Sequence, residues 1–375
     1  LDVIAHLPGC SGEDADAVGA YHQIMLSDAE RLLGKGALPQ TWIRIPKNRH
    51  PKSWSSIDDP VVPLECNLYG HPLAGLLWDK GSQEKIQRCG FEKVDGWESL
   101  YVHKKNQVFL GVYVDDFHMA GKTENLKPMW DALRKELDID EAVPFHKNTY
   151  LGTTQVDVEQ DDKIIESKKN LIKTIMTNLA PSGNPQKKED DKENEGTLPQ
   201  EENKETKSSK KKKGKGQGHK CGETCTMPVR AWEYQMHGSA EKCVERYLEL
   251  ANKKLKDLKK VTTPCMDDHQ LSPEDFDTKG KLADKASKAV LKCLYLARKA
   301  RPDVIWAVND LARNITKWNI ACDKRLFRLI CYLQTTKDYS MHCYVGDEAK
   351  DCQIWLFTDA SFAADIRDSK STSGV

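Results

Sequence analysis

The fold of this chain is decided by Val108-Phe109-Leu110-Gly111-Val112-Tyr113-Val114-Asp115-Asp116-Phe117-His118-Met119. Apolar, strand-forming residues come before and after two adjacent aspartates, a pattern that predicts a strand, a tight turn and a second strand. Neighbouring side chains of a strand point to opposite faces, so Asp115 and Asp116 can converge on one ion only where the chain turns. Crowded carboxylates have raised pKa values unless a cation compensates them. The segment therefore predicts a β-hairpin with both aspartates at its tip, as a divalent-cation site or as a solvated turn.

Length and charge limit the class of protein. The chain has 375 residues, enough for two or three hydrophobic cores, so we expect more than one domain. It has 57 basic and 57 acidic residues, and this zero net charge favours neither a polyanionic nor a polycationic partner. No run of about 18 apolar residues and no signal peptide is visible, so we expect no membrane partner.

The cysteines and the two ends of the chain indicate its context. Most of the twelve cysteines are single and lie in apolar periodic segments, as Cys243, Cys293 and Cys331 do. This distribution predicts reduced, buried thiols in a cytosolic or nuclear protein. The chain begins without methionine and ends at Val375, in what reads as the start of a strand. We therefore expect a fragment of a longer polyprotein.

Two motifs resemble those of reverse transcriptases. Tyr113-Val114-Asp115-Asp116 between apolar strands resembles the polymerase motif, and Asp16, Ala20 and Tyr21 have the spacing found in copia-type retrotransposons. The resemblance implies that Asp16 is the third metal ligand and that the ring of Tyr21 packs under the incoming sugar and excludes a 2′-hydroxyl. Tyr113 would lie near the primer end.

The residues around Asp16 also allow other interpretations. Asp14 is a rival ligand, although its spacing to Tyr21 differs from that of the family. From the residues alone, the segment could equally be an acidic loop that opens a helix, with Asp14 or Asp16 as N-cap.

Further matches follow in family order. Leu68, Tyr69, Gly70 and Trp78 resemble a Leu-Tyr-Gly motif followed by an aromatic residue. The family places a glutamine that touches the nucleotide near the position of Leu73, so this apolar residue puts the strength of nucleotide binding in question. Tyr150-Leu151-Gly152 resembles a hairpin that contacts the primer strand, which implies a substrate-binding role for Gly152.

The periodicity between these motifs predicts the order of elements in a polymerase palm. A helix is expected to end near Gly90, and strands are expected over 91–94 and 100–103, before the hairpin. Residues 123–137 then predict a helix that backs the sheet.

Composition changes sharply after the palm. Residues 183–220 are rich in Glu, Lys, Asp, Ser and Gly, so they lack the apolar side chains of a core and predict a disordered tether. Its basic half, residues 207–220, could instead contact nucleic acid or serve in nuclear import. His219, Cys221 and Cys225 have only part of a zinc-ligand spacing, so a zinc-dependent hydrolase lacks a complete ligand set.

The last third of the chain predicts helices and then strands. Helical spacing extends over 244–258, with a lysine-rich outer face, and over 284–300, 302–316 and 322–335. Arg301-Pro302-Asp303-Val304 resembles the family's connection segment. Strands are expected over 341–345 and 354–357. Asp359 and the run Ser371-Thr372-Ser373-Gly374 resemble the first strand and turn of a ribonuclease H domain, in which Asp359 would be a metal ligand. That enzyme needs further carboxylates that follow Val375.

The expected fold class is α+β. It combines a right-handed reverse-transcriptase palm with incomplete fingers, a helical thumb or connection, and a truncated ribonuclease H-like α/β domain. The expected boundaries are 1–180 for the palm and partial fingers, 181–226 for the tether, 227–335 for the thumb and connection, and 336–375 for the ribonuclease H-like start.

The resemblance implies RNA-directed DNA polymerase activity within a retrotransposon polyprotein. Asp16, Asp115 and Asp116 would hold two Mg²⁺ ions, with Mn²⁺ as an alternative, in two-metal nucleotidyl transfer to a primer 3′-hydroxyl. The implied partners are RNA and DNA template-primers, deoxynucleoside triphosphates and other parts of the polyprotein, and the implied locations are cytoplasmic virus-like particles and the nucleus. The alternatives are an inactive retroelement remnant and a nucleic-acid-binding module without chemistry.

Overall fold

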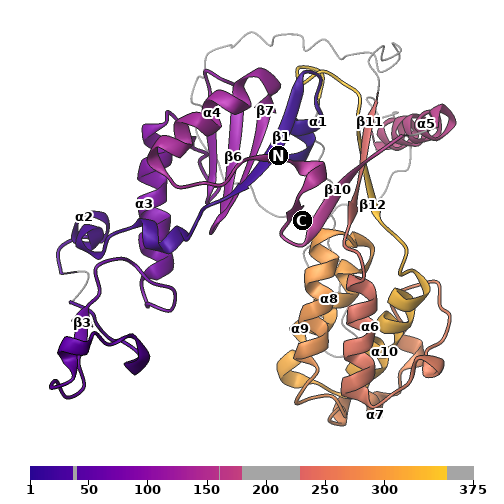
Figure 1. Cartoon of the computed structure of the whole chain (residues 1–375). Helices are drawn as coiled ribbons and strands as arrows, with labels where there is room; N and C mark the ends of the chain where they lie inside the picture. The colour runs from indigo at the N-terminus through magenta and orange to yellow at the C-terminus, as the bar shows by residue number, and fades with distance from the viewer. Residues whose placement is uncertain (37–39, 160, 180–228, 353–375) are drawn as a thin grey trace, which may run out of the picture. The chain divides into compact units, whose positions relative to one another are not determined.

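The computed structural model describes residues 1–36, 40–159, 161–179 and 229–352 (Figure 1). The chain divides into two compact units, one of residues 1–159 with 229–375 and one of residues 160–228. In the second unit the described element is helix α5 (Asp162–Leu179). The predicted tether over 181–226, the strand over 354–357, Asp359 and the run 371–374 lie outside the described residues.

The first sheet carries the predicted hairpin. Its strand order is β4-β5-β6-β7-β1-β8, with every neighbouring pair antiparallel. The strands are β1 (Cys10–Asp16), β4 (Glu92–Lys93), β5 (Leu100–His103), β6 (Val108–Tyr113), β7 (Asp116–Lys122) and β8 (Val143–Pro144). The prediction of two strands joined at Asp115 and Asp116 is therefore confirmed.

Two helices cover one face of this sheet (Figure 1). They are α3 (Ala74–Arg88) and α4 (Thr123–Glu136). Alternate residues of the hairpin strands, such as Leu110 and Phe117, point to this face and are fully buried against Leu77 and Trp130 of the helices. Apolar side chains recur every second residue in the strands and about every 3.6 residues in the helices, so both kinds of element contribute one apolar face to a shared core. The helix predicted over 123–137 is confirmed.

The opposite face of the sheet bears the acidic residues. Helix α1 (Asp2–His6) and the 3₁₀ turn η5 (Phe145–Lys147) contact this face, where Ala5, Ala120 and Phe145 form a small apolar cluster. Asp14, Asp16 and Asp116 belong to this face because they alternate with the buried Ala15 and Phe117 along their strands.

Short elements connect β1 with α3. They are η1 (Ala20–Gln23), η2 (Leu26–Asp28), α2 (Ala29–Leu33), β2 (Trp42–Arg44), η3 (Lys47–Arg49), η4 (Lys52–Trp54) and β3 (Val61–Pro63). Strands β2 and β3 form a separate antiparallel pair.

A second sheet joins distant parts of the chain in the order β12-β11-β10-β9. Its strands are β9 (Thr149–Tyr150), β10 (Thr153–Val158), β11 (Arg230–Gln235) and β12 (Met341–Val345). The strand predicted over 341–345 is present, and it pairs with β11. Strands β10, β11 and β12 come from three different predicted domains, divided at 181–226 and at 336, yet they pair within one sheet.

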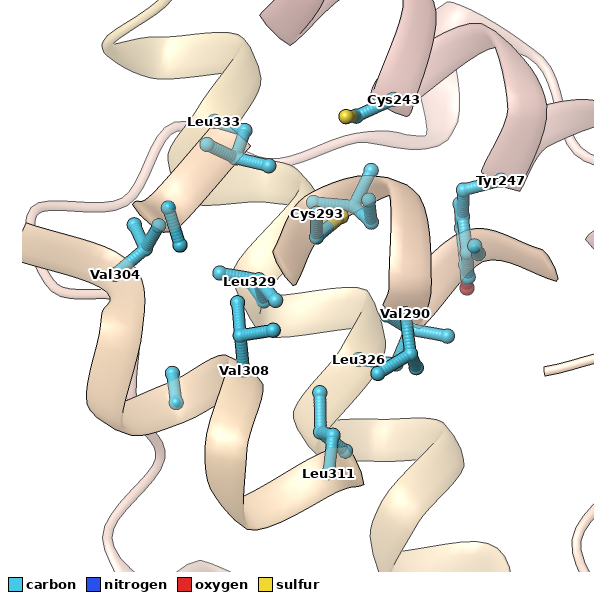
Figure 2. Packing of buried hydrophobic residues seen from close by; sticks show 14 of the residues in the cluster. Cys243, Tyr247, Val290, Cys293, Val304, Val308, Leu311, Leu326, Leu329 and Leu333 are labelled. Carbon is cyan, nitrogen blue, oxygen red and sulfur yellow. The ribbon is translucent and has the colours of Figure 1, made fainter. Parts of the chain in front are cut away.

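The remaining elements form a helical bundle around a second core. They are α6 (Ser239–Ala251), η6 (Leu255–Asp257), η7 (Asp268–Gln270), α7 (Pro273–Asp277), α8 (Ser287–Lys299), η8 (Pro302–Val304), α9 (Ile305–Arg313), η9 (Ile315–Lys317) and α10 (Ile320–Thr335). Figure 2 shows the side chains of Cys243, Val290, Val308 and Leu329 converging in this core. The described cysteines are free thiols, and Cys243, Cys293 and Cys331 are buried as predicted.

The helix expected over 244–258 is shorter than its periodicity predicts. It ends at Ala251, because Asn252 adopts the left-handed conformation (φ +51°) and the Lys253 amide donates to the Leu248 carbonyl. This is a common way to end a helix. The prediction of a lysine-rich helix face is therefore wrong. Lys253 to Lys260 follow the helix in a segment that contains the 3₁₀ turn η6, and Lys253 Nζ lies 5.1 Å from the ring centroid of Phe327.

The buried Arg301 forms an ion pair with Asp303 at the start of α9. Its guanidinium donates to both carboxylate oxygens of Asp303, at 2.9 and 2.8 Å, and to the carbonyl and hydroxyl of Thr336. The side chain is 3% exposed. Helix α9 begins three residues after the predicted Pro302, because η8 precedes it. Across the part of the chain that the structure describes, no helix is both long and apolar enough to cross a membrane.

Candidate active site

The tip of the hairpin is a tight turn between β6 and β7. Tyr113 and Asp116 pair across the two strands, and Val114 and Asp115 form the turn. Val114 has φ +57°, a conformation that is rare for a β-branched residue and costs about 1–3 kcal/mol. The hairpin holds this conformation at the residue that precedes the two aspartates.

The end of β1 brings a third carboxylate to the tip. Asp16 lies opposite Asp116 in the β1–β7 register, and the Ala17 amide donates to the Asp115 carbonyl over 2.8 Å. Asp16 is exposed, while Asp115 and Asp116 are half-buried. The structure therefore brings together the three aspartates predicted from sequence, at the accessible edge of one sheet face. The N-cap alternative for Asp14 and Asp16 is wrong, because both residues lie in a strand.

Mutual repulsion perturbs the titration of this cluster. Burial, followed by the charges of Asp16 and Asp115, raises the pKa of Asp116 to about 6. Burial and the charge of Asp115 also raise the pKa of Asp16. The proximity of the two carboxyl groups opposes the rise in the pKa of Asp16 and adds to the rise in the pKa of Asp116, so the two groups titrate as a linked pair. Such perturbation is typical of carboxylates that receive a cation.

The residues present fit a magnesium site in their chemistry. Carboxylate oxygens are the donors that Mg²⁺ prefers, and it fills remaining positions with water and substrate phosphate. Within the described residues, no three His, Cys, Asp or Glu side chains are already arranged to hold a metal ion. The excess negative charge of Asp16, Asp115 and Asp116 is the feature that a divalent cation would neutralise.

Two stacked tyrosines lie beside the aspartates. The rings of Tyr21 and Tyr69 are 4.3 Å apart between centroids with an interplanar angle of 29°. Burial, followed by the charge of Asp115, raises the pKa of Tyr69, which indicates that its hydroxyl is close to the hairpin tip. Tyr21 therefore stacks on Tyr69, a residue to which the sequence analysis assigned no function, and the contact of Tyr21 with an incoming sugar stays a prediction. The position of Tyr69 in the Leu-Tyr-Gly motif was the available signal.

The other predicted substrate-binding residues have different surroundings. Tyr113 is exposed beside the aspartates. Leu73 immediately precedes α3, and its side chain packs partly buried against the first core. Gly152 has φ +75° in the turn between β9 and β10, next to Leu151, whose carbonyl accepts a 2.5 Å hydrogen bond from the Tyr295 hydroxyl of α8. Leu73 thus packs against the first core, and Gly152 lies beside a contact with the helical bundle.

Asp14 belongs to a separate buried network. Its carboxylate contacts His118 Nδ1 at 2.5 Å and accepts a 3.2 Å hydrogen bond from the Asn148 amide. His118 Nε2 lies 2.8 Å from the carboxylate of Asp2, which also accepts a hydrogen bond from Tyr234. Burial lowers the pKa of His118, but the hydrogen bonds to Asp14 and Asp2 outweigh this effect and raise it. Asp14 is therefore engaged with His118 and Asn148, apart from the cluster of Asp16, Asp115 and Asp116.

Comparison with known proteins shows similarity over part of the chain. Ninety residues, 24% of the chain, are 31% identical to the Transposon Ty1-GR1 Gag-Pol polyprotein of Saccharomyces cerevisiae. Seventy-six residues are 32% identical to the Ty1-DR4 and TyH3 Gag-Pol polyproteins of the same yeast. The aligned segment spans 5% of the length of the Ty1-GR1 polyprotein. No protein-family model and no solved structure matches the chain.

Proposed function

We propose that this chain is the reverse-transcriptase part of a copia-type retrotransposon polyprotein and catalyses RNA-directed DNA synthesis. The observation that carries the proposal is the convergence of Asp16, Asp115 and Asp116 at the tip of a β-hairpin, with raised pKa values for Asp16 and Asp116. The partial similarity to transposon Gag-Pol polyproteins supports the retroelement origin.

The three aspartates would hold two Mg²⁺ ions. When bound, these ions lower the pKa of the primer 3′-hydroxyl and stabilise the leaving pyrophosphate. The protein supplies no covalent nucleophile, so its contribution is alignment and charge. Pairing of β1 with β7 fixes the distance between Asp16 and Asp116, and the Ala17–Asp115 hydrogen bond attaches the turn to β1.

The tyrosines would select the substrate. The stacked rings of Tyr21 and Tyr69 form an aromatic surface next to Asp115, where the sugar of an incoming nucleotide would lie. A ring held there leaves no room for a 2′-hydroxyl. Tyr113, exposed at the same tip, would contact the primer end. These roles are parts of the proposal.

The proposal extends to partners and location. The enzyme would act on RNA and DNA template-primers, together with other parts of its polyprotein. It would act in cytoplasmic virus-like particles and in the nucleus. The ribonuclease H-like start around Asp359 remains part of this proposal.

Primer extension tests the activity. A labelled DNA primer on an RNA template is incubated with deoxynucleotides and Mg²⁺, using the parent chain, Asp115→Asn and the control Asp131→Asn. Asp131 lies on the exposed part of α4 and pairs with Lys127 and Arg134, away from the hairpin. Extension by the parent and the control, but not by Asp115→Asn, supports the polymerase. Extension by Asp115→Asn contradicts it, and binding without extension by any folded variant favours a nucleic-acid-binding or inactive remnant.

A further inference from the structure

We propose that Trp78 is a positioning residue that holds the aspartate hairpin in its reactive conformation. Its indole Nε1 donates a 2.6 Å hydrogen bond to the carbonyl oxygen of Val114, the residue at the hairpin tip. The catalytic role of Trp78 rests on the proposed function. The claim that its indole fixes the turn rests on the geometry alone.

The hydrogen bond acts on the peptide unit that carries Asp115. The Val114 carbonyl and the Asp115 amide share one planar peptide group, so fixing the oxygen also fixes the direction in which the chain enters Asp115. The Ala17 amide holds the Asp115 carbonyl, the next peptide group, over 2.8 Å. Two successive peptide groups are thus held by neighbours outside the hairpin.

The turn needs such support because its backbone is strained. Val114 is β-branched and has φ +57°, so an unrestrained turn would relax to a conformation with a different direction for Asp115 and Asp116. Val114 lies in the turn, outside the paired residues of β6 and β7, so no amide of the β6–β7 ladder donates to its carbonyl. The indole supplies a donor from helix α3 instead.

Trp78 is itself rigidly held. Its side chain is 3% exposed and belongs to the first core, packed with residues such as Leu77 and Ile86. A buried donor on a helix costs little entropy when it binds, because its rotamer is already fixed. The hydrogen bond therefore attaches the turn to a side chain that the core already holds in place, and this restrains the turn.

A second tryptophan separates packing from hydrogen bonding. Trp130 of α4 is 1% exposed in the same core, and its indole Nε1 has no hydrogen-bond partner among the described residues. Replacing either tryptophan with phenylalanine removes a similar volume from one core. The substitution at position 78 also removes the support of the turn, so Trp130→Phe is the matched control.

Hydrogen exchange tests the inference independently of catalysis. Amide exchange in a peptide covering 108–119 is measured by mass spectrometry for the parent, Trp78→Phe and Trp130→Phe, each with its unfolding midpoint. Loss of the hydrogen bond should make exchange in this peptide about five- to tenfold faster in Trp78→Phe than in Trp130→Phe at matched stability. Equal exchange in the two variants overturns the inference.

Steady-state primer extension then tests the catalytic meaning. Trp78→Phe should lower kcat about tenfold with little change in the KM for nucleotide, because the hairpin orients the reacting groups while the tyrosines bind the sugar. Trp130→Phe should keep the parent kcat. Equal kcat in the two variants overturns the catalytic role. If the parent itself extends no primer, the proposed function fails, while the exchange comparison still decides whether Trp78 holds the turn.

Discussion

Asp16 and Asp116 lie directly opposite each other across β1 and β7, at the open end of the strand pair. The two residues are 100 positions apart in the sequence, and the strand register alone brings them together. Burial, followed by charge repulsion from the neighbouring carboxylates, raises the pKa of each group. The pair is thus destabilising in the free protein and suited to a cation.

The first prediction concerns pH. The pKa of Asp116 is about 6 in the folded protein and 3.8 when unperturbed, so the folded state binds more protons between these values. The free energy of unfolding of the metal-free protein should therefore fall as the pH rises from about 4 to 6. Asp116→Asn removes this dependence and should be more stable than the parent by about 1 kcal/mol at pH 7.5, after discounting for solvent screening.

Urea denaturation in the presence of a chelator measures this difference. The stability gap between Asp116→Asn and the parent should widen between about pH 4 and 6 and then stay nearly constant. A gap that does not change with pH would contradict the raised pKa of Asp116.

The second prediction concerns sugar selection. Tyr69→Leu removes the ring that stacks on Tyr21, a contact worth about 0.5–1.5 kcal/mol. The preference for deoxynucleotides over ribonucleotides should drop by about three- to tenfold, because Tyr21 gains freedom to move. Tyr69→Phe keeps the stack and should keep the preference. Single-nucleotide incorporation of dNTP and rNTP gives the ratio, and an unchanged ratio in Tyr69→Leu would rule out this role.

The third prediction concerns the ion pair of the buried Arg301 in the bundle. Arg301→Met removes the bidentate partner of Asp303, whose side chain is 35% exposed, and the donors to Thr336, and should destabilise the protein by about 1–2 kcal/mol. Burial raises the pKa of Asp303, but the hydrogen bonds and charge of Arg301 outweigh this and lower it. The stabilisation is therefore present above about pH 4 and is lost as the pH falls further.

Thermal or urea unfolding of Arg301→Met measures the loss. Arg313→Met is the control, because Arg313 is exposed and forms a surface pair with Asp310 at 3.5 Å. It should change stability by about 0.5 kcal/mol at most. Equal effects of the two substitutions would mean that the Arg301–Asp303 pair contributes little.

The fourth prediction concerns the turn between β9 and β10. Gly152→Ala places a side chain at φ +75°, and the new Cβ would meet the Tyr295 hydroxyl at 3.3 Å. We expect a loss of about 1–2 kcal/mol. Gly75→Ala is the control, because this glycine lies in α3 and its added Cβ meets only the Tyr21 hydroxyl, at 3.9 Å. That variant should be as stable as the parent or more so, and a tolerated Gly152→Ala would show that the turn adapts.

The hairpin was predictable because its signals are local. Alternating apolar residues around Asp115 and Asp116 define strands and turn within twelve residues. The end of α6 was missed for a local reason as well. Apolar residues continue at helical spacing as far as Leu258, and Asn252, a residue that tolerates the left-handed conformation, was the overlooked stop signal.

Long-range relationships could not be read from the sequence. The pairing of β11 with β10 and β12, the network of Asp2, Asp14 and His118, and the hydrogen bond from Trp78 to Val114 each join segments that no local pattern connects. Trp78 matches the aromatic residue that follows the Leu-Tyr-Gly motif of the family. The sequence does not show that its indole donates to the Val114 carbonyl, because this hydrogen bond forms only when α3 packs against the hairpin.

Divalent-cation binding tests most directly the claim that Asp16, Asp115 and Asp116 form one site. Titration of the metal-free chain with Mn²⁺, followed by electron paramagnetic resonance, compares the parent with the triple variant Asp16→Asn, Asp115→Asn, Asp116→Asn. We predict saturable binding by the parent and at least about tenfold weaker binding by the folded variant. Equal binding by both proteins would contradict the account.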